Sequence, residues 1–416
     1  MPLLSRLASY WGVTRPRRFD RAIPASLGGA GLIATAAAAL WFAAAGELAP
    51  TGPRAIYLLY VAILFAVALA AVRWPRIAGT LLVLGAIDLC WGLASPGLLP
   101  PSRAEPQRFA WHALLQVVPI PSLDIVSSNG LAIRHSSQGT RGRDPGPGGL
   151  AGRTVVATYG GSTGYDIGVG EGDTWSDRLN EALGRARYFV VNHGVPGYTT
   201  VEHLLQTAFY QEKFGRLPSC AVYYVGWNDL RNAHIPALDP AYADFHLPSQ
   251  VDSLKVRRVG GGNVTFSPLL TVLARVLSAE VDTVRYAVDP YAYPPRSGDD
   301  PALTALFRRN VQSISRINRE RGVATVWVGQ LVNRERLAGD GRYGWLPLVR
   351  DRDVWPMLQT LNRVLAETAT ALGDSVVIVP PDTFGPDDFV DNGHFSARGA
   401  RRFADALVPA VREACR

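Results

Sequence analysis

The first hundred residues contain three long apolar runs, at residues 23–45, 55–72 and 77–99. No other feature limits the fold so strongly, because about 18 to 20 apolar residues in a helix suffice to cross the hydrocarbon core of a bilayer. A cleaved signal peptide has one short apolar segment followed by small residues at its cleavage site. Three runs in succession therefore predict three transmembrane helices.

Positive charges set the expected orientation of these helices. Residues 1–22 form a basic tail with five arginines, and the loop before the third run adds Arg73 and Arg76, whereas the first loop has only Arg54. Short segments rich in arginine stay in the cytoplasm. An odd number of spans then places everything after residue 99 on the opposite, extracytoplasmic side.

Two residues of the third run are notable. Asp88 lies near its middle, and a carboxyl group inside a membrane is a candidate functional group. Three short spans offer little surface for a transport path, so we favour a protonated Asp88 that hydrogen-bonds a neighbouring helix. Cys90 is expected to be buried in the same run.

The formal net charge of +7 comes almost wholly from arginine, since the only lysines are Lys213 and Lys255. Proteins that bind nucleic acids gather their basic residues on one face or element. The arginines of this chain are scattered along it, so we expect no nucleic-acid partner.

Residues 100–152 are rich in proline, glycine, serine and arginine, which is typical of an irregular linker. From residue 153 to the C-terminus, short apolar stretches alternate with helix-like stretches. The expected strands cover residues 154–159, 188–192, 221–225, 324–329 and 375–379. The expected helices cover residues 174–183, 200–213, 301–321, 354–372 and 397–412. This alternation predicts an α/β domain with a five-stranded parallel sheet covered by helices on both faces.

Ser162 follows the first expected strand directly, in the sequence Gly160-Gly161-Ser162-Thr163-Gly164. Glycines on both sides permit a tight strand-to-helix bend that exposes the hydroxyl group. A plain turn is the alternative, and a phosphate site is disfavoured because the Walker lysine and the dinucleotide glycine spacing are both missing. The run also fits the G-x-S-x-G elbow of α/β-hydrolases, but there the elbow follows a central strand well into the domain.

Candidate partners of Ser162 follow later strands. Gly197 comes after the second expected strand, and Asn228 comes after the third. The carboxyl ends of parallel strands share one edge of the sheet. The backbone N–H groups of Ser162 and Gly197 and the amide of Asn228 could therefore stabilise an oxyanion. Asn228 precedes an aspartate, and such a pair after a strand is by itself more often just a turn.

Asp391 and His394 lie three residues apart near the C-terminus. A serine nucleophile needs a histidine to accept its proton and a carboxylate to orient that histidine. One loop can deliver both groups together. A lone surface histidine without a catalytic role is the ordinary alternative. We disfavour it because Ser162, Gly197 and Asn228 follow successive expected strands.

In order, context and spacing, Ser162, Gly197, Asn228 and His394 resemble the SGNH (GDSL-like) hydrolase superfamily over residues 153–416. The resemblance implies a flavodoxin-like three-layer α/β/α sandwich. Ser162 would be the nucleophile, His394 the general base and Asp391 its partner, with Ser162, Gly197 and Asn228 forming the oxyanion hole. Neither a metal nor a cofactor is implied.

One position departs from the family pattern, because Gly161 stands where the Gly-Asp-Ser block has its aspartate. Without this aspartate, the sequence does not indicate which residue supports the turn that carries Ser162. Gly-Gly-Ser-Thr variants are similar to membrane-attached bacterial members of the superfamily. The resemblance thus implies a multi-pass protein of the bacterial cytoplasmic (inner) membrane, with its catalytic domain on the periplasmic side.

The superfamily includes lipases, esterases that remove O-acetyl groups from carbohydrates, and acetyltransferases of envelope polysaccharides. Residues 231–300 carry several aromatic side chains and residues 333–355 several arginines. These segments favour a glycan ester as substrate, although plain loop packing explains the aromatic residues equally well. We expect a serine esterase acting on O-acetyl esters; an O-acetyltransferase and a catalytically silent binding or assembly subunit are the alternatives.

Cys220 begins the third expected strand and Cys415 ends the last expected helix, which places both at the end of the sheet away from Ser162. An extracytoplasmic domain lies in an oxidising compartment. A Cys220–Cys415 disulfide is therefore a hypothesis, which requires Cα atoms close enough to be bridged. The sequence shows no zinc-like spacing of cysteine and histidine.

Overall fold

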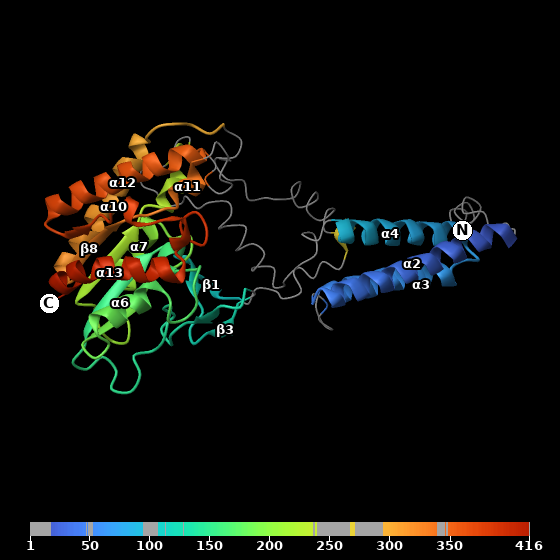
Figure 1. Ribbon diagram of the computed structural model, residues 1–416, viewed down its shortest axis with the longest axis horizontal. Helices are drawn as coiled ribbons and strands as arrows, with labels where there is room; N and C mark the ends of the chain where they lie inside the picture. Colours follow the sequence, from blue (N-terminus) through green and yellow to red (C-terminus); the bar gives the residue numbers. More distant parts are fainter. Residues whose placement is uncertain are drawn as a thin grey trace, which may run out of the picture. The chain divides into compact units, whose positions relative to one another are not determined.

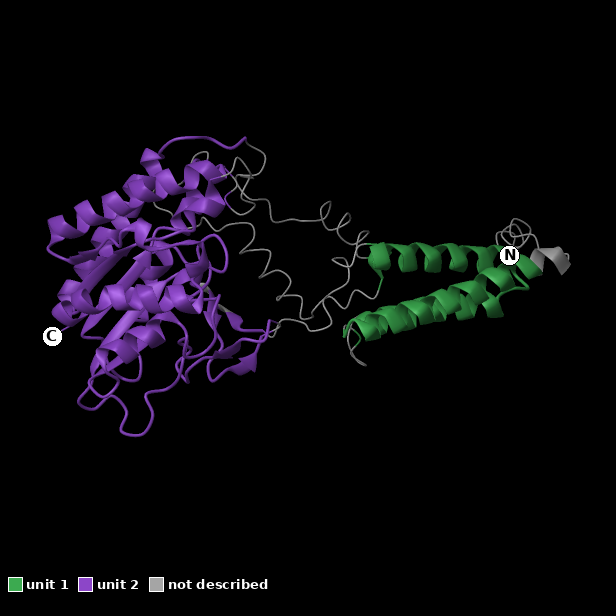
Figure 2. Ribbon diagram, viewed as in Figure 1, with its two compact units in different colours: residues 1–105, 259–285 green, residues 106–258, 286–416 purple. Residues whose placement is uncertain are grey.

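A computed structural model of the chain describes residues 18–46, 48, 53–94, 107–112, 114–127, 129–235, 238, 267–270, 294–338, 346 and 348–415. The chain divides into two compact units (Figure 2). Unit 1 comprises residues 1–105 and 259–285, and unit 2 comprises residues 106–258 and 286–416.

Unit 1 contains the helices α2 (Arg18–Ala44), α3 (Pro53–Ala70) and α4 (Pro75–Ala94), shown in Figure 1. Helices therefore form where the three apolar runs predict them. Among the described residues, two stretches are long and apolar enough to cross a membrane, Ala22–Ala44 and Pro75–Ala94. Arg54–Ala70 is a shorter apolar helix, so the second of the three predicted spans, residues 55–72, does not meet this criterion.

Small residues allow the helices of unit 1 to approach closely. A Cβ atom added to Gly31 would lie 2.4 Å from the Phe65 ring, and one added to Gly92 would lie 2.4 Å from the Tyr57 hydroxyl group. Close approach at glycine is a common packing mode of helices in lipid. Large apolar side chains such as Leu40 remain exposed on the outside of this bundle.

Of the two notable residues of α4, Asp88 is hydrogen-bonded as expected but lies off the middle of its helix, and Cys90 is not buried. Because α4 ends at Ala94, Asp88 lies about 9 Å from that end at 1.5 Å per residue, rather than near the middle of a span. Asp88 is fully buried, and its carboxylate accepts hydrogen bonds from Ser267 Oγ and the Leu269 backbone N–H. Cys90 is exposed on the surface of the helix, where a buried residue was expected.

Unit 2 is built on a parallel five-stranded sheet with the strand order β6-β5-β7-β8-β9. The strands are β5 (Thr154–Gly160), β6 (Tyr188–Asn192), β7 (Cys220–Val225), β8 (Ala324–Gly329) and β9 (Ser375–Val377). All five predicted strands are confirmed. In chain order within the sheet this is 2-1-3-4-5, the order of flavodoxin-like sheets.

Alternate residues of the strands enter two different cores because successive side chains point to opposite faces of a sheet. Tyr223 and Trp327 belong to one core and Val222 and Val326 to the other. The first core is shared with α10 and α12, and the second with α6 and α13. The result is a three-layer α/β/α sandwich (Figure 1).

The helices of unit 2 match the predicted ones closely. They are α6 (Trp175–Leu183), α7 (Thr200–Phe209), α10 (Pro301–Glu320), α12 (Asp351–Leu372) and α13 (Ala397–Ala414). The largest difference is at α7, which ends at Phe209 instead of residue 213. The helix ends at its cap residue Tyr210, whose φ of −131° and ψ of 18° are not helical.

The stretch interpreted as an irregular linker contains two short antiparallel hairpins. The first pairs β1 (Phe109–His112) with β2 (Gln116–Pro119), and the second pairs β3 (Asp124–Val126) with β4 (Ala132–Arg134). Ile133 is fully buried. Pro119 is the last residue of β2, where it does not interrupt the pairing, and the glycines of the stretch stand outside these four strands.

Cys220 at the start of β7 and Cys415 at the end of α13 form a disulfide, with Cα atoms 5.3 Å apart. The hypothesis from the sequence is therefore confirmed. The bond joins a central strand to the last helix at the end of the sheet opposite Ser162.

Candidate active site

Ser162 lies at the carboxyl end of β5, as the first residue of the short helix α5 (Ser162–Tyr165). The backbone N–H groups of Gly164 and Tyr165 both donate to the Gly161 carbonyl oxygen, at 3.0 and 2.9 Å, which closes a tight turn. The first N–H groups of a helix have no partner within it. Ser162, which is 8% exposed, thus stands where backbone donors point outward.

His394 lies beside Ser162 and connects it to Asp391. His394 Nε2 is 2.7 Å from Ser162 Oγ, and His394 Nδ1 is 2.6 Å from Asp391 Oδ2. The other oxygen, Asp391 Oδ1, accepts hydrogen bonds from the backbone N–H groups of Gly393 and His394. The structure thus brings the three predicted residues into an unbroken chain of hydrogen bonds.

The electrostatics of Asp391 favour its charged form. Partial burial raises the pKa of Asp391, but the hydrogen bond and the charge of His394, together with the two backbone donors, outweigh burial and lower the pKa to about 2. Asp391 is therefore a carboxylate at neutral pH. A carboxylate on Nδ1 holds the imidazole in the orientation that leaves Nε2 to accept a proton from serine.

The His394 loop (residues 389–395) closes on itself. Phe389 and Phe395 face each other as an antiparallel bridge, and the Val390 N–H donates to the His394 carbonyl oxygen at 2.9 Å. Gly393 packs against the Trp227 ring, at 3.6 Å from where its Cβ would be. The loop is thus short and packed on the Trp227 ring, which explains how one turn can hold both Asp391 and His394 in place.

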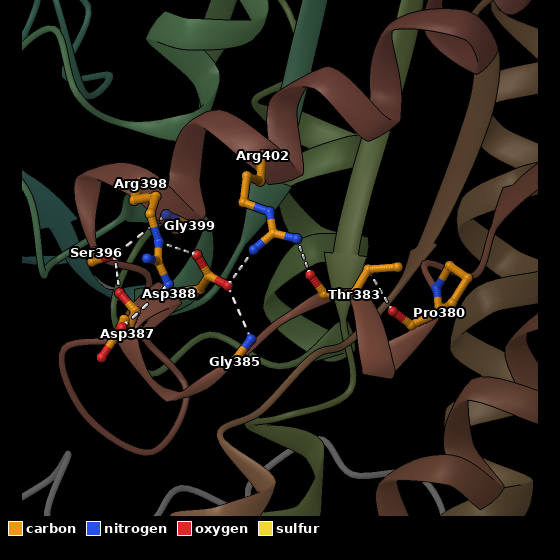
Figure 3. Close-up of polar contacts among 9 residues, drawn as sticks. All are labelled: Pro380, Thr383, Gly385, Asp387, Asp388, Ser396, Arg398, Gly399 and Arg402. Carbon is orange, nitrogen blue, oxygen red and sulfur yellow. Dashed lines mark hydrogen bonds and ion pairs between the residues drawn. The ribbon is translucent and has the colours of Figure 1, made fainter.

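Asp388 fixes both ends of the His394 loop (Figure 3). This carboxylate is fully buried and accepts hydrogen bonds from Arg398 Nε and Arg402 Nη1, both at 2.8 Å, and from the Gly385 N–H at 2.9 Å. Both arginines belong to α13. The Ser396 N–H donates to the Asp388 carbonyl oxygen at 2.9 Å. The chain before the loop is thereby held to the helix that follows it.

Asn228 lies next to the serine turn. Its side-chain Nδ2 donates to the Tyr198 carbonyl oxygen at 2.8 Å. Tyr198 follows Gly197, which adopts the left-handed φ of +90° in the turn after β6. An amide nitrogen carries two hydrogens, so one fixes the Asn228 side chain and the other is available to a ligand. The Ser162, Gly197 and Asn228 segments therefore meet as predicted.

Gly161 explains the departure from the Gly-Asp-Ser pattern. A Cβ atom added at this position would lie only 2.0 Å from Asn228 Nδ2 and 3.2 Å from the Tyr198 carbonyl oxygen. The amide of Asn228 occupies the space that any side chain at 161 would need. The serine turn is instead supported by Asn192, whose Nδ2 donates to the Gly164 carbonyl oxygen at 2.9 Å.

Sequence reasoning missed the roles of two buried aspartates. Asp229 accepts hydrogen bonds from the N–H and hydroxyl groups of Thr200, at 3.1 and 2.6 Å, and so fixes the start of α7 beside Asn228. Burial, which outweighs these hydrogen bonds, raises the pKa of Asp229 to about 6. Asp166 accepts from the Trp175 N–H at the start of α6, and burial raises its pKa to about 8. No pattern in the sequence indicates that Asp229 contacts Thr200, 29 residues away, or that Asp166 contacts Trp175, 9 residues away.

The predicted substrate segments are described only in part. Asn333, the start of the second segment, donates its N–H to the Asn392 carbonyl oxygen at 2.9 Å, so that segment reaches the His394 loop. The short helix α11 (Arg334–Leu337) follows. A cavity of about 290 Å³ separates α11 from residues 384–389. The aromatic residues Tyr242, Phe245, Tyr286, Tyr291 and Tyr293 lie outside the described residues.

Among the described residues, no group of three or more histidine, cysteine, aspartate or glutamate side chains could hold a metal ion. The arrangement is instead suited to nucleophilic chemistry at a carbonyl group. It offers a serine hydroxyl, a base in contact with it, and an amide donor on the other side of the serine turn.

No protein-family model matches the sequence, and no curated protein matches it. Solved structures of similar fold include TesA (14% identity, 62% of this chain, 99% of that chain, TM-score 0.35). Others are a GDSL-like lipase from Bacteroides thetaiotaomicron (13%, 63%, 89%, 0.36) and an acetyl xylan esterase (12%, 62%, 99%, 0.36). Similarity at this level assigns no activity to the chain, so the chemistry of the site follows from its own geometry.

Proposed function

We propose that this protein is a membrane-anchored serine esterase of SGNH type that removes O-acyl groups, chiefly O-acetyl, from an envelope or extracellular glycan. The observation that carries the proposal is the hydrogen-bonded series Ser162 Oγ, His394 and Asp391, at 2.7 and 2.6 Å. Serine hydroxyl groups in ordinary surface positions have no such base in contact with them. In this arrangement His394 can accept the Ser162 proton, which makes the serine oxygen a stronger nucleophile.

The reaction would proceed in two acyl transfers. Ser162 Oγ attacks the ester carbonyl carbon while its proton passes to His394 Nε2. The tetrahedral intermediate then expels the substrate alcohol, which takes that proton from His394, and the acyl group stays on Ser162. Water next attacks the acyl carbon while its proton passes to His394 Nε2. The second tetrahedral intermediate then breaks its bond to Ser162 Oγ, which takes that proton from His394, and the carboxylic acid leaves.

The developing oxyanion would be held by the amide of Asn228 and by the backbone N–H groups of Ser162 and Gly197. Donors arranged in advance stabilise the transition state more than the substrate, because the negative charge is only then fully developed. The bond from Asn228 Nδ2 to the Tyr198 carbonyl oxygen supports this role, since it fixes the amide before substrate arrives.

The location on the outer side of the membrane has two independent supports. The basic residues cluster in residues 1–22, up to the first turn of α2, and at Arg73 and Arg76, around the start of α4, which favours a cytoplasmic position for both. A disulfide joins Cys220 to Cys415 in unit 2, and such bonds persist in oxidising compartments. An enzyme facing outward meets envelope and extracellular polymers, which is why we propose a glycan ester as its substrate.

The first test uses the full-length chain in detergent micelles. Hydrolysis of p-nitrophenyl acetate is measured for the wild type, for Ser162→Ala, and for Ser313→Ala, a matched change at a half-buried serine of α10. We expect loss of turnover with Ser162→Ala alone. A fluorophosphonate probe should label the wild type and Ser313→Ala but not Ser162→Ala. Equal turnover and labelling of all three proteins would refute the proposal and favour a silent binding subunit.

The substrate class requires a second measurement. Acetate release is followed from a panel of O-acetylated glycans and from long-chain acyl esters, again with Ser162→Ala as the control. Release from one or more glycans and poor turnover of long-chain esters are the expected results. Preference for long-chain esters would overturn the glycan part of the proposal while leaving the esterase part intact.

A further inference from the structure

The carboxylate of Asp88 is engaged by a segment that is distant in sequence. Ser267 Oγ lies 2.9 and 2.8 Å from the two carboxylate oxygens, and the Leu269 N–H donates to Oδ1 at 2.8 Å. The side chain of Tyr60 on α3 also hydrogen-bonds both Asp88 and Ser267. Asp88 and Ser267 are each fully buried, so this is an interior contact within unit 1.

Residues 267–270 have the sequence of a helix start. Ser267 Oγ accepts the Leu270 N–H at 3.1 Å, as an N-cap serine does, and Pro268 occupies the first helical position, where its missing N–H costs nothing. The first N–H groups of a helical turn need an acceptor. Asp88, on another helix, supplies an acceptor for the Leu269 N–H. The turn supplies the donors that the buried Asp88 side chain needs.

The turn at residues 267–270 comes from a segment that interrupts unit 2 in the sequence. Unit 2 is interrupted between residues 235 and 294, and within that interruption residues 259–285 belong to unit 1. The turn meets α4 in its last two turns, and α4 ends at Ala94, from which the chain continues to unit 2. The insertion therefore reaches the bundle at the same end from which the chain leaves it.

We propose that Ser267–Leu270 is an anchor that fastens the insertion in unit 2 to the membrane helices, with Asp88 as its receptor. The two units are then joined twice, through residues 95–106 and through the anchor. A buried carboxylate in a membrane helix, which is costly without partners, is explained by this intramolecular role and needs no transported ion. The anchor does not depend on the esterase chemistry.

The test measures how accessible the anchor is. Pro268 is buried and contributes none of the hydrogen bonds to Asp88, so Pro268→Cys is a suitable reporter. The full-length chain carrying Cys90→Ala is placed in lipid nanodiscs and treated with a charged maleimide. Ser297→Cys, at an exposed position of unit 2, serves as the reference for free reactivity.

With Asp88 intact, the thiol of Pro268→Cys should react much more slowly than that of Ser297→Cys. Adding Asp88→Leu should accelerate the reaction roughly ten-fold or more, because the hydrogen bonds from Ser267 and Leu269 to this carboxyl group are lost together. Adding Ser267→Ala instead should accelerate it too. This second variant leaves every residue of the three helices unchanged, so an effect from it cannot come from unfolding of the bundle.

Two results would overturn the anchor. One is a thiol of Pro268→Cys that reacts as fast as that of Ser297→Cys while Asp88 is present. The other is acceleration by Asp88→Leu with none by Ser267→Ala, which would assign the effect to damage within the helices. Turnover of p-nitrophenyl acetate, recorded on the same samples, shows separately whether the esterase proposal holds.

Discussion

Gly161→Ala is the substitution that most directly tests the geometry of the site. The new Cβ atom would lie 2.0 Å from Asn228 Nδ2 and 3.1 Å from Asn228 Cγ, whereas real Cβ atoms do not approach other heavy atoms closer than 3.0 Å. The amide must therefore move by about 1 Å or more. The φ of Gly161 is −73°, so a left-handed backbone is not what requires glycine here; the contact with Asn228 is the feature that this substitution tests.

The displacement should affect catalysis far more than stability. Asn228 would lose its fixed position opposite the serine, and loss of one oxyanion donor lowers kcat by about 10²- to 10³-fold, or roughly 3 to 4 kcal/mol of transition-state stabilisation. Its bond to the Tyr198 carbonyl oxygen is a single neutral hydrogen bond, worth about 1 kcal/mol to the fold. We thus expect a folded protein with little turnover.

The assay is kcat for p-nitrophenyl acetate with the full-length chain. Gly385→Ala is the matched control, because no atom lies within 4 Å of its added Cβ, and it should retain normal turnover. If Gly161 acts through the amide, Gly161→Ala should cost almost nothing further in an Asn228→Ala background. A kcat within about threefold of wild type, or full additivity of the two substitutions, would refute this reasoning.

Three further predictions concern the supports of the site. The pKa of Asp391 is lowered to about 2 from its ordinary 3.8, so its pairing stabilises the fold above about pH 4, and this contribution is lost as the pH falls through about 2. Asp391→Asn should flatten the acid-unfolding curve in that range, measured by circular dichroism, and lower kcat about 10⁴-fold; an unchanged curve would contradict the pairing. Asp388→Asn leaves two half-exposed arginines without their buried partner and should cost about 2 to 3 kcal/mol of unfolding free energy, with a Tm at the wild-type value as the contrary result. Cys220→Ser with Cys415→Ser should cost roughly 3 to 5 kcal/mol, and reducing agent should then have no further effect on denaturant unfolding.

Local patterns account for what could be predicted from the sequence. The five strands are apolar runs bounded by glycine and polar residues, and each candidate group directly follows a strand or precedes a capped helix. Ser162 and Asn228 were found in this way. Asp391 and His394 were found because both lie on one short loop, so no long-range contact had to be known.

Contacts between distant segments account for what was missed. Glycine is needed at position 161 because the side-chain amide of Asn228, 67 residues later in the chain, occupies the space beside it. The partners of Asp88 lie 179 and 181 residues away. In the small hairpins of residues 109–134, Phe109 and Val117 pack against Val195 and Tyr198, far along the chain. Strands of three or four residues also leave little periodicity to detect.

The disulfide has a topological consequence for the site. Cys220 and Cys415 are separated by 195 residues, and the covalent ring that they close contains Asn228, Asp391, His394 and the whole insertion. Ser162 lies outside the ring, on the part of the chain that leads back to unit 1. A single proteolytic cut anywhere in the insertion would open the ring without releasing either fragment. His394 would then stay tethered to Ser162, and the two fragments would separate on a gel only after reduction.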